Sequence, residues 1–425
     1  MNTPRRYKIV GLLFAGSAIN YIDRVNISVA APAMMLANGW RKDEFGLVFS
    51  VFLLGYGLMQ IPAGLLADRG SPRRLLAVAF CGFSLFTALT PLGAHALVWL
   101  LLTRLLMGAC EASTFPATTA LNSRWFPSNE FGRAQTLSLA GGSFGQMVAY
   151  PLTAWIVIEI SWQAAFYVSA VLGFLWVVTW LWNSTDRPRD HPNIGLQEVS
   201  LIEGVKPLEE TQGISLRALL TSAPVVYLGA SAMCFGFVVW TFIFWFPTYL
   251  MEARGVSLAT VGTLGVGIQV CGFLGTVTSG LVSDAILHRK FKPSVARPKF
   301  AGACVVAAVI FLIGAAMTPS TILCVCLFAL FYCFVMAANV AYLATPAALH
   351  PWQSASIFGI INCCASFGAV CGPALVGHIV AHAANWQRSF AIVGAVGLVC
   401  AVFLFCVPVR RLDLPDVIHA KFLKQ

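Results

Sequence analysis

The stretch QAAFYVSAVLGFLWVVTWLWN, residues 163–183, contains no charged side chain. A helix of about 20 apolar residues is long enough to cross the hydrocarbon layer of a bilayer, which is about 30 Å thick. Runs of this kind recur along nearly the whole chain of 425 residues, of which 58% are hydrophobic and only 10% charged. This composition excludes a soluble enzyme, because about a quarter of the residues in an ordinary soluble domain are charged. The sequence indicates an all-α membrane protein with many spans.

The apolar runs and the residues that interrupt them predict twelve spans. They fall near residues 9–33, 45–67, 75–94, 96–120, 134–158, 163–183, 223–250, 257–283, 300–318, 320–347, 353–381 and 387–408. The only long polar stretch, residues 184–222, separates six spans from six, and we interpret it as a cytoplasmic linker. The predicted domains are a six-helix bundle at 1–183, the linker at 184–222, and a second six-helix bundle at 223–425 with a short cytoplasmic tail.

The distribution of basic residues sets the expected orientation. The 27 Lys and Arg residues outnumber the 17 Asp and Glu residues and give a formal net charge of +10. Most of them fall on the side of the predicted bilayer that both chain ends share, and basic loops tend to stay cytoplasmic. Both termini are therefore expected in the cytoplasm. Topology and contact with membrane lipid then account for the basic balance, without a nucleic-acid partner.

The two halves of the chain carry similar residues in the same order. Trp162-Gln163 and Ser143-Phe144-Gly145 recur in the second half as Trp386-Gln387 and Ser366-Phe367-Gly368. Because six is an even number of spans, both copies have the same orientation in the membrane. Parallel six-helix repeats with a central binding site are one of the transporter architectures.

Only four formally charged residues fall within the predicted hydrocarbon layer. Asp23 and Arg24 lie in the first span, and Arg104 and Glu111 lie two helical turns apart in the fourth. A charged side chain at the centre of a membrane helix costs about 2.5–3.5 kcal/mol by insertion scales. We therefore expect the four to pair and to act in function. The alternative is a static ion-pair network that fastens two helices, although apolar packing would stabilise the bundle as well or better.

The charge balance of this cluster suggests a mechanism. Two carboxylates and two guanidiniums make it neutral, and protonating one carboxylate leaves an unpaired cation that can hold an anion. Proton binding and anion binding then favour each other, which is the linkage that symport requires. Arginine suits the anion-binding role because it grips a carboxylate through two parallel hydrogen bonds. Asp23 and Glu111 suit the titrating role.

Neutral polar residues on other spans could hydrogen-bond a substrate's hydroxyl groups. They are Tyr56 and Gln60 on the second span, Gln146 on the fifth, Asn339 and Tyr342 on the tenth, and Asn362 on the eleventh. The alternative for each is a hydrogen bond to a neighbouring helix. Both interpretations stay open, with Tyr56, Gln146 and Asn362 as the leading candidates.

Two further features lie at span ends. A possible conformational latch follows the second span and recurs in part as Gly280 and Asp284; its first copy comprises Gly64, Asp68, Arg69, Arg73 and Arg74. An Asp at a helix end facing basic residues can hold helices in one conformation, or the segment can be a solvated loop. His378 and His382 are four residues apart and could bind a metal, but no acid or Cys lies near them in sequence. No metal site and no cofactor are expected.

Several stretches resemble a known family. The twelve-span repeat and the loop from Gly64 to Arg74 look like the major facilitator superfamily. Within it, the chain resembles the anion:cation symporter family at Asn20-Tyr21-Ile22-Asp23-Arg24, at the run from Arg104 to Pro116, at Trp125-Phe126-Pro127 and at Trp245-Phe246-Pro247. The loop departs from the superfamily pattern at Ser71, where Gly is usual. The seventh span has no Arg, unlike the glutamate-carrying relatives, which argues against that substrate.

The resemblance implies a function and roles for several residues. Bacterial members carry sugar acids, and some carry aromatic or dicarboxylic acids, together with protons. By resemblance, Asp23 and Glu111 are the protonation sites, Arg24 couples proton to substrate, and Arg104 shapes an electropositive site. The residues implied to line the cavity are Tyr21, Tyr56, Gln146 and Asn362.

Taken together, these features predict a proton-coupled symporter of the bacterial inner membrane that imports a small organic anion by alternating access. The expected substrate is a sugar acid such as a hexonate, hexarate or hexuronate, and a monomer is expected. Aromatic or dicarboxylic acids are the alternative substrates. A proton-coupled drug exporter is a rival within the same fold, and a membrane-embedded enzyme or an ion channel is a rival from another class. No nucleophile or metal set supports the enzyme, and no ring of like charges supports the channel.

Overall fold

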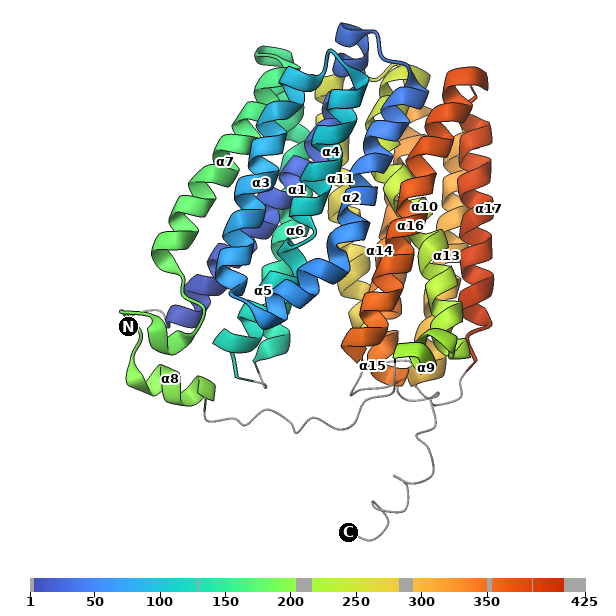
Figure 1. Ribbon diagram of the computed structural model, residues 1–425. Helices are drawn as coiled ribbons and strands as arrows, with labels where there is room; N and C mark the ends of the chain where they lie inside the picture. Colours follow the sequence, from blue (N-terminus) through green and yellow to red (C-terminus); the bar gives the residue numbers. More distant parts are fainter. Residues whose placement is uncertain are drawn as a thin grey trace. The chain divides into compact units, whose positions relative to one another are not determined.

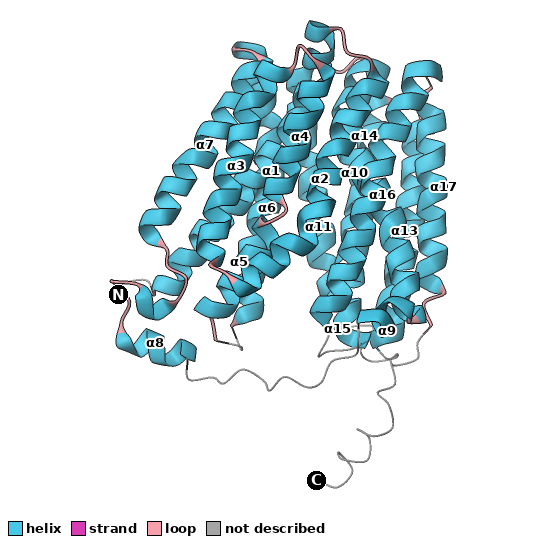
Figure 2. Cartoon of the chain, viewed as in Figure 1, coloured by secondary structure: helices cyan, strands magenta, loops and turns pink. Residues whose placement is uncertain are grey.

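A computed structural model describes residues 4–127, 130–203, 216–282, 293–349, 354–383 and 385–408 of the chain. The regular secondary structure in these residues is all helical, with loops between the helices, and the described part contains no strand (Figure 2). The long helices are labelled in Figure 1: α1 (Arg5–Asn38), α2 (Lys42–Arg69), α3 (Pro72–Gly93), α4 (Leu97–Glu111), α5 (Thr114–Trp125), α6 (Phe131–Glu159), α7 (Trp162–Asn183), α10 (Ala223–Arg254), α11 (Leu258–Val282), α13 (Pro293–Met317), α14 (Thr321–Leu343), α16 (Ser354–Ala383) and α17 (Trp386–Phe405). The short helices are η1 (Pro188–Asp190), α8 (Leu196–Glu203), α9 (Leu216–Thr221) and α15 (Thr345–Leu349).

Ten helical segments in the described part are long and apolar enough to cross a membrane, with α4 and α5 forming one of them. They correspond to ten of the twelve predicted spans. The other two predicted spans coincide with α1 and α6, which are long helices but do not meet the same apolar requirement. The mean hydropathy of α1 is lowered because the charged residues Asp23 and Arg24 interrupt its apolar run. The helical membrane-protein class is confirmed, and the total of twelve spans stays a prediction.

The chain forms two compact units. Unit 1 comprises Met1–Leu208, Thr241–Gln269 and Pro373–Ala384. Unit 2 comprises Glu209–Trp240, Val270–Gly372 and Asn385–Gln425. Unit 1 therefore contains the whole of the predicted first bundle together with parts of α10, α11 and α16. The domain boundaries expected at residues 184 and 223 stay predictions.

Glycines let the helices of unit 1 approach one another closely. A Cβ atom built on Gly141 of α6 would lie 2.0 Å from the carbonyl oxygen of Phe14 in α1. A Cβ atom on Gly108 of α4 would lie 2.0 Å from the carbonyl oxygen of Phe52 in α2. Such distances leave no room for a side chain, so the backbones themselves are in contact. These two crossings fix α1 against α6 and α2 against α4.

The predicted fourth span is interrupted where α4 ends and α5 begins. Pro116 has no N–H, and in a continuous helix its ring would clash with the carbonyl group four residues earlier. The N–H of Ala112 still bonds to Gly108 at 3.0 Å, but the N–H of Ser113 bonds to Cys110 at 3.3 Å, in the tighter pattern of a 3₁₀ turn. The helix breaks at this point, and Glu111 is the last residue of α4.

Parts of α10 and α16 pack against α2 inside unit 1. The ring of Phe49 in α2 stacks on Phe244 in α10, with 4.5 Å between the ring centroids. Trp245 donates a hydrogen bond from its indole nitrogen to the carbonyl oxygen of Pro373 in α16, at 3.0 Å. Lys42 forms an ion pair with Glu252 at 2.8 Å. All of these contacts lie toward the end of unit 1 opposite the start of α1, which we call the far end.

Unit 2 has its own apolar core. It is built from α9, α10, α13, α14, α16 and α17, and it contains buried residues such as Leu228, Ala301 and Leu404. Two features tie α11 to α14. The hydroxyl of Ser279 donates to the carbonyl oxygen of Ala337 at 2.7 Å, and a Cβ atom on Gly275 would lie 2.0 Å from the carbonyl oxygen of Cys333.

Candidate functional site

The first pair of the predicted charged cluster joins α1 to α4. Arg24 donates from Nε to Oε1 of Glu111 at 2.7 Å, and its Nη2 forms an ion pair with the same oxygen. Both residues are buried, with 4% and 1% of their surface exposed. Because Glu111 is the last residue of α4, its negative charge sits at the unfavourable end of the helix dipole. The guanidinium of Arg24 compensates for this position.

Aromatic rings surround the guanidinium of Arg24. Its central carbon lies 4.9 Å from the ring centroid of Tyr21, 4.8 Å from that of Tyr56 and 5.6 Å from that of Phe52. Aromatic faces attract a cation at such distances, and the attraction grows where water is excluded. The ring of Tyr21 packs against α6, where a Cβ atom on Gly142 would lie 2.6 Å from it. The predicted cavity residues Tyr21 and Tyr56 are thus brought to Arg24.

Asp23 bonds to a neutral residue and not, as expected, to one of the two arginines of the charged cluster. Its Oδ2 accepts a hydrogen bond from the hydroxyl of Thr87 in α3, and its Oδ1 is buried without a hydrogen-bond partner among the described residues. With 2% of its surface exposed, Asp23 is as inaccessible as Glu111. It therefore holds a carboxyl group deep in unit 1 with one oxygen unsatisfied.

Arg104 likewise forms no ion pair with a residue that the structure describes. It is fully buried, its Nη1 lies 3.0 Å from the sulfur of Met107, and its central carbon lies 5.0 Å from the ring centroid of Phe52. Its Nε and Nη2 have no hydrogen-bond partner within the described part of the chain. The expectation that all four charges pair is therefore wrong in this structure. Of the four, only Arg24 and Glu111 form an ion pair, whereas Asp23 bonds to Thr87 and Arg104 lies against Met107.

The remaining predicted site residues have more varied surroundings. Gln60 lies on α2, one helical turn from Tyr56, and its Nε2 is buried without a partner among the described residues. Gln146 lies on α6, one turn from Gly142. Asn362 lies on α16 in unit 2, so its part in the site stays a prediction. Tyr342 donates to the carbonyl oxygen of Leu228 at 3.4 Å, which matches the alternative of a bond to a neighbouring helix.

The buried charges and the long apolar helices are typical of a membrane carrier. The sequence model of the Major Facilitator Superfamily matches residues 13–351. The chain belongs to this superfamily. Its members and the chain's relatives are membrane transporters, not enzymes. The resemblance seen in the sequence is thereby confirmed at the level of the superfamily.

Two relatives and one solved structure extend this result. The chain is 27% identical to a probable galactarate/D-glucarate transporter of Bacillus subtilis (strain 168), GudP, over 97% of this chain and 94% of the relative. It is 27% identical to a probable sulfoacetate transporter of Cupriavidus necator, SauU, over 97% of this chain and 96% of the relative. A bacterial homologue of the human lysosomal transporter Spinster has a similar fold, with a TM-score of 0.78 at 19% identity, covering 96% of this chain and 98% of that one.

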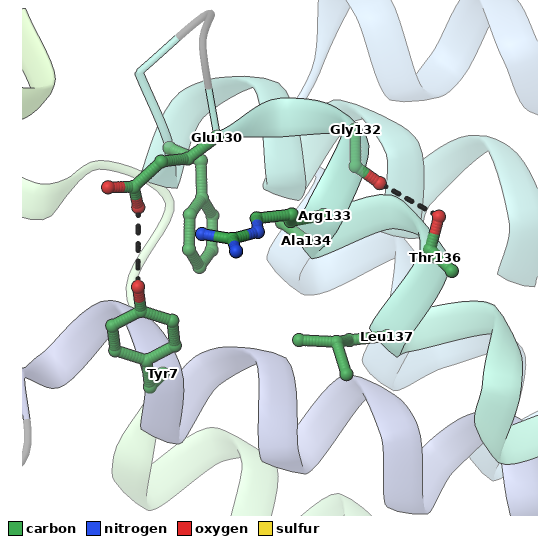
Figure 3. Close-up of a pocket in the computed structure, with 8 residues that line it drawn as sticks. Tyr7, Glu130, Gly132, Arg133, Ala134, Thr136 and Leu137 are labelled. Atoms are coloured by element: carbon green, nitrogen blue, oxygen red, sulfur yellow. Dashed lines mark hydrogen bonds between the residues drawn. The ribbon is translucent and has the colours of Figure 1, made fainter.

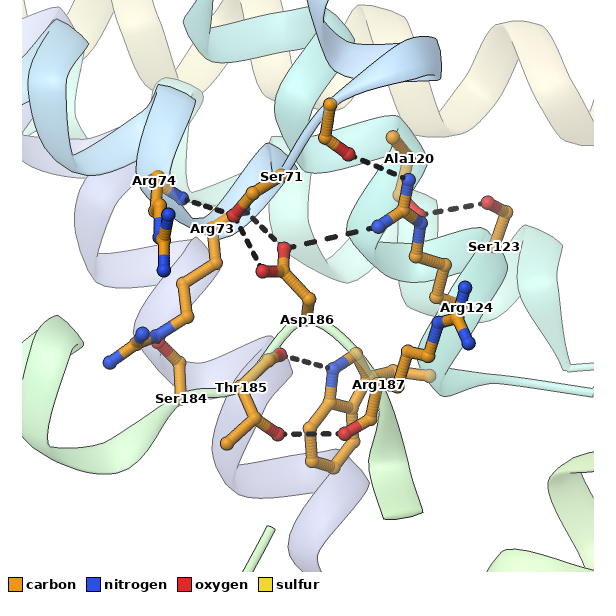
Figure 4. Close-up of polar contacts among 12 residues, drawn as sticks. Ser71, Arg73, Arg74, Ala120, Ser123, Arg124, Ser184, Thr185, Asp186 and Arg187 are labelled. Carbon is orange, nitrogen blue, oxygen red and sulfur yellow. Dashed lines mark hydrogen bonds and ion pairs between the residues drawn. The ribbon is translucent and has the colours of Figure 1, made fainter. Parts of the chain in front are cut away.

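The superfamily loop between α2 and α3 is held by a residue that the sequence analysis missed. Asp186, which follows α7, accepts bonds from the backbone N–H of Arg73 at 3.0 Å and the hydroxyl of Ser71 at 2.5 Å (Figure 4). Arg124 lies 3.9 Å from the same carboxylate. A carboxylate is favourable at the start of a helix, where free N–H groups and the helix dipole meet it. Asp186 thus anchors the start of α3 within unit 1.

The predicted latch residues make fewer polar contacts than Asp186 does. Asp68 and Arg69 are exposed, and neither forms an ion pair within the described part of the chain. Arg73 donates to the hydroxyl of Ser184 at 3.2 Å, so it joins the Asp186 contacts. Asp284, the second copy of the acidic residue, lies outside the described residues. A latch formed by Gly64, Asp68, Arg69, Arg73, Arg74 and Asp284 stays a prediction.

A second carboxylate anchors the start of α1. Glu198 in α8 accepts bonds from the backbone N–H groups of Arg5 at 3.0 Å and Arg6 at 3.1 Å. Arg6 also forms an ion pair with Glu130 at 3.2 Å. Beside it lies a cavity of about 500 Å³, in which the hydroxyl of Tyr7 faces Glu130 (Figure 3). At 1.5 Å per residue, Tyr7 is about 25 Å along α1 from the charged cluster, so this cavity is a separate feature.

Proposed function

We propose that this chain is a proton-coupled symporter that imports a small organic anion by alternating access. The observation that carries the proposal is the incomplete pairing of the buried cluster. Arg104 has guanidinium nitrogens without a partner among the described residues, and Asp23 has a carboxyl oxygen in the same condition. Buried polar groups are normally satisfied, so such atoms are typical of sites that bind something else. An anion suits Arg104, and a proton suits Asp23.

The pair between Arg24 and Glu111 supplies the coupling step. A proton on Glu111 removes the negative charge that holds Arg24, and the guanidinium then becomes a donor for an incoming carboxylate. Conversely, an anion on Arg24 competes with Glu111 for the same nitrogens and favours its protonation. Each ligand strengthens the binding of the other, as linkage requires. Proton and anion then enter the site together.

The names of the relatives favour a substrate with two anionic groups. Galactarate and glucarate carry a carboxylate at each end, and sulfoacetate carries a sulfonate and a carboxylate. Two guanidiniums, Arg24 and Arg104, lie in the buried cluster and match such a pair of groups. Among sugar acids, we therefore favour a hexarate over a hexonate or hexuronate. Tyr21, Tyr56, Gln60, Gln146 and Asn362 are proposed to bind its hydroxyl groups.

The cellular setting belongs to the same proposal. The basic loops support an orientation with both termini in the cytoplasm, and the bacterial relatives support an inner membrane. We propose that the chain acts as a monomer surrounded by membrane lipid, since each unit has a buried core of its own. No cofactor takes part in the proposed cycle.

Uptake into proteoliposomes under an imposed inward proton gradient tests this function. The panel should contain a hexarate, a hexonate, a hexuronate, sulfoacetate and an aromatic acid. The proposal predicts gradient-driven accumulation of at least one hydroxylated acid, with the hexarate transported best. Accumulation of aromatic acids alone would establish the alternative substrate class. Transport of cationic dyes with no anion uptake would contradict the proposal and favour a drug exporter.

A further inference from the structure

Three side chains of types that can coordinate a metal ion meet at the far end of unit 1. Asp43 lies in the first turn of α2, and His378 and His382 lie in the last two turns of α16. One ligand atom from each of the three lies within 4.8 Å of the others. The histidines are four residues apart on one helix, so their rings share a face, and the ring centroids are 4.2 Å apart. The acid that the sequence did not provide near the histidines comes from the other half of the chain.

The hydrogen bonds of His382 show which ring nitrogen carries the lone pair that could bind a metal ion. Its Nδ1 lies 2.9 Å from the carbonyl oxygen of His378, and its Nε2 lies 3.2 Å from Nη2 of Arg41. Arginine can only donate, so Nε2 accepts, and the proton of a neutral ring resides on Nδ1. A backbone carbonyl that accepts from one ring nitrogen while the other faces a ligand is the usual arrangement of metal-bound histidine.

Asp43 also has an oxygen to offer. Its Oδ2 accepts from Arg41 at 2.8 Å, while its Oδ1 is buried without a hydrogen-bond partner in the described part of the chain. The guanidinium of Arg41 therefore bridges Asp43 and His382 from the solvent side. Its side chain is 59% exposed and can swing away into water. A cation already lies between two of the three ligands, in the position that a metal ion would take.

We propose that Asp43, His378 and His382 form a binding site for a divalent transition-metal ion such as Zn²⁺. Two imidazole nitrogens and one carboxylate oxygen are a ligand set that Zn²⁺ prefers, with water completing the tetrahedron. Calcium and magnesium are disfavoured because they require several oxygen ligands. When bound, the ion displaces Arg41 and links α2 to α16.

The consequence for transport rests on the proposed function. Alternating access requires the far ends of helices from the two halves of the chain to separate during each cycle. In this structure α2 and α16 are in contact there, and the ion pair of Lys42 with Glu252 lies beside them at a cavity of about 590 Å³. A Zn²⁺ ion shared by the two helices holds them together and slows the cycle.

Zn²⁺ binding is measured first, by calorimetry on the purified full chain, without any transport assay. We expect one site whose affinity falls at least about tenfold in His378→Ala, in His382→Ala and in Asp43→Asn. Arg41→Gln should tighten binding by about tenfold, because it removes a positive charge next to the dication. His95→Ala, an exposed histidine outside the cluster, is the matched control. Unchanged affinity in His378→Ala and His382→Ala would overturn the proposal.

The 13 cysteines require a control for thiolate binding. Co²⁺ in place of Zn²⁺ should give an absorption spectrum of nitrogen and oxygen ligation that disappears in the His378→Ala, His382→Ala double variant. If the spectrum consisted only of a thiolate-to-cobalt band, and that band were unchanged in the double variant, the assignment of the site to the two histidines would be refuted.

Zn²⁺ is added on the side of the proteoliposome membrane to which the far end of unit 1 is exposed. It should slow substrate uptake in the native chain and not in the His378→Ala, His382→Ala double variant. Equal slowing in both would refute the link between α2 and α16. A chain that binds Zn²⁺ as described but takes up no organic anion would contradict only the proposed function.

Discussion

Arg24 of α1 donates both of its described hydrogen bonds with Glu111 to a single oxygen, Oε1, at the last residue of α4. The second carboxyl oxygen of Glu111 is buried without a hydrogen-bond partner among the described residues. The pair therefore uses one carboxyl oxygen of Glu111, and Oε2 is the oxygen on which we propose that the proton binds. Because Glu111, and not Asp23, forms the ion pair with Arg24, we propose that Glu111 is the carboxyl group that exchanges a proton for an anion on Arg24.

Replacing Glu111→Gln should uncouple transport. The amide keeps the shape of the side chain and mimics the protonated acid, so Arg24 stays available to the substrate. We expect counterflow exchange of substrate to continue while accumulation driven by a proton gradient disappears. Loss of both activities in a protein that still folds would reject Glu111 as the proton carrier.

Arg104→Met should abolish substrate uptake without lowering stability. Removing two charge-assisted hydrogen bonds to an anion weakens binding by about 100-fold or more. An apolar side chain of similar length removes a buried charge that has no ion-pair partner among the described residues, which is neutral or stabilising. Uptake and Tm are measured on the same preparation. A fall in Tm together with intact uptake would show that Arg104 serves the fold instead.

Asp186→Asn should destabilise unit 1. The change removes the negative charge that accepts from the backbone N–H of Arg73 and the hydroxyl of Ser71 at the start of α3, at a cost of about 1–2 kcal/mol. A lower Tm in detergent is the expected result. Asp68→Asn is the matched control, because Asp68 is exposed and forms no ion pair within the described part. Equal effects of the two substitutions would contradict the role assigned to Asp186.

Gly108→Ala should force α2 and α4 apart. The new methyl group would lie 2.0 Å from the carbonyl oxygen of Phe52, and overpacking of this kind costs about 1–3 kcal/mol. Because Phe52 also packs against Arg24 and Arg104, uptake should fall together with Tm. Gly267→Ala on α11 is the control and should change neither quantity, because no described atom lies within 4 Å of the place its methyl group would take.

The sequence alone predicted the ten apolar helical segments and singled out the buried charged residues for a simple physical reason. A charge in an apolar run is costly, so Asp23, Arg24 and Glu111 stand out without any knowledge of the fold. The break between α4 and α5 beside Pro116 also has a local cause. The backbone chemistry of proline acts locally and can be recognised in any context.

The partners of these residues were not predictable from sequence. Thr87 bonds to Asp23 because of how α1 and α3 rotate against each other, and threonines are common in spans without such a role. Asp186 falls in a polar segment that resembles an ordinary linker. Asp43 is far from His378 in sequence, and only helix packing brings the two together. Contacts of this kind depend on the rotation and register of whole helices.

Coupled binding is the central claim, and calorimetry of substrate binding tests it most directly. Titrating a hexarate into the purified chain in two buffers of different ionisation enthalpy gives the number of protons taken up on binding. The account predicts net proton uptake in the native chain and a clear reduction in Glu111→Gln, with substrate still bound. Binding of the same anion with no proton uptake in the native chain would contradict it.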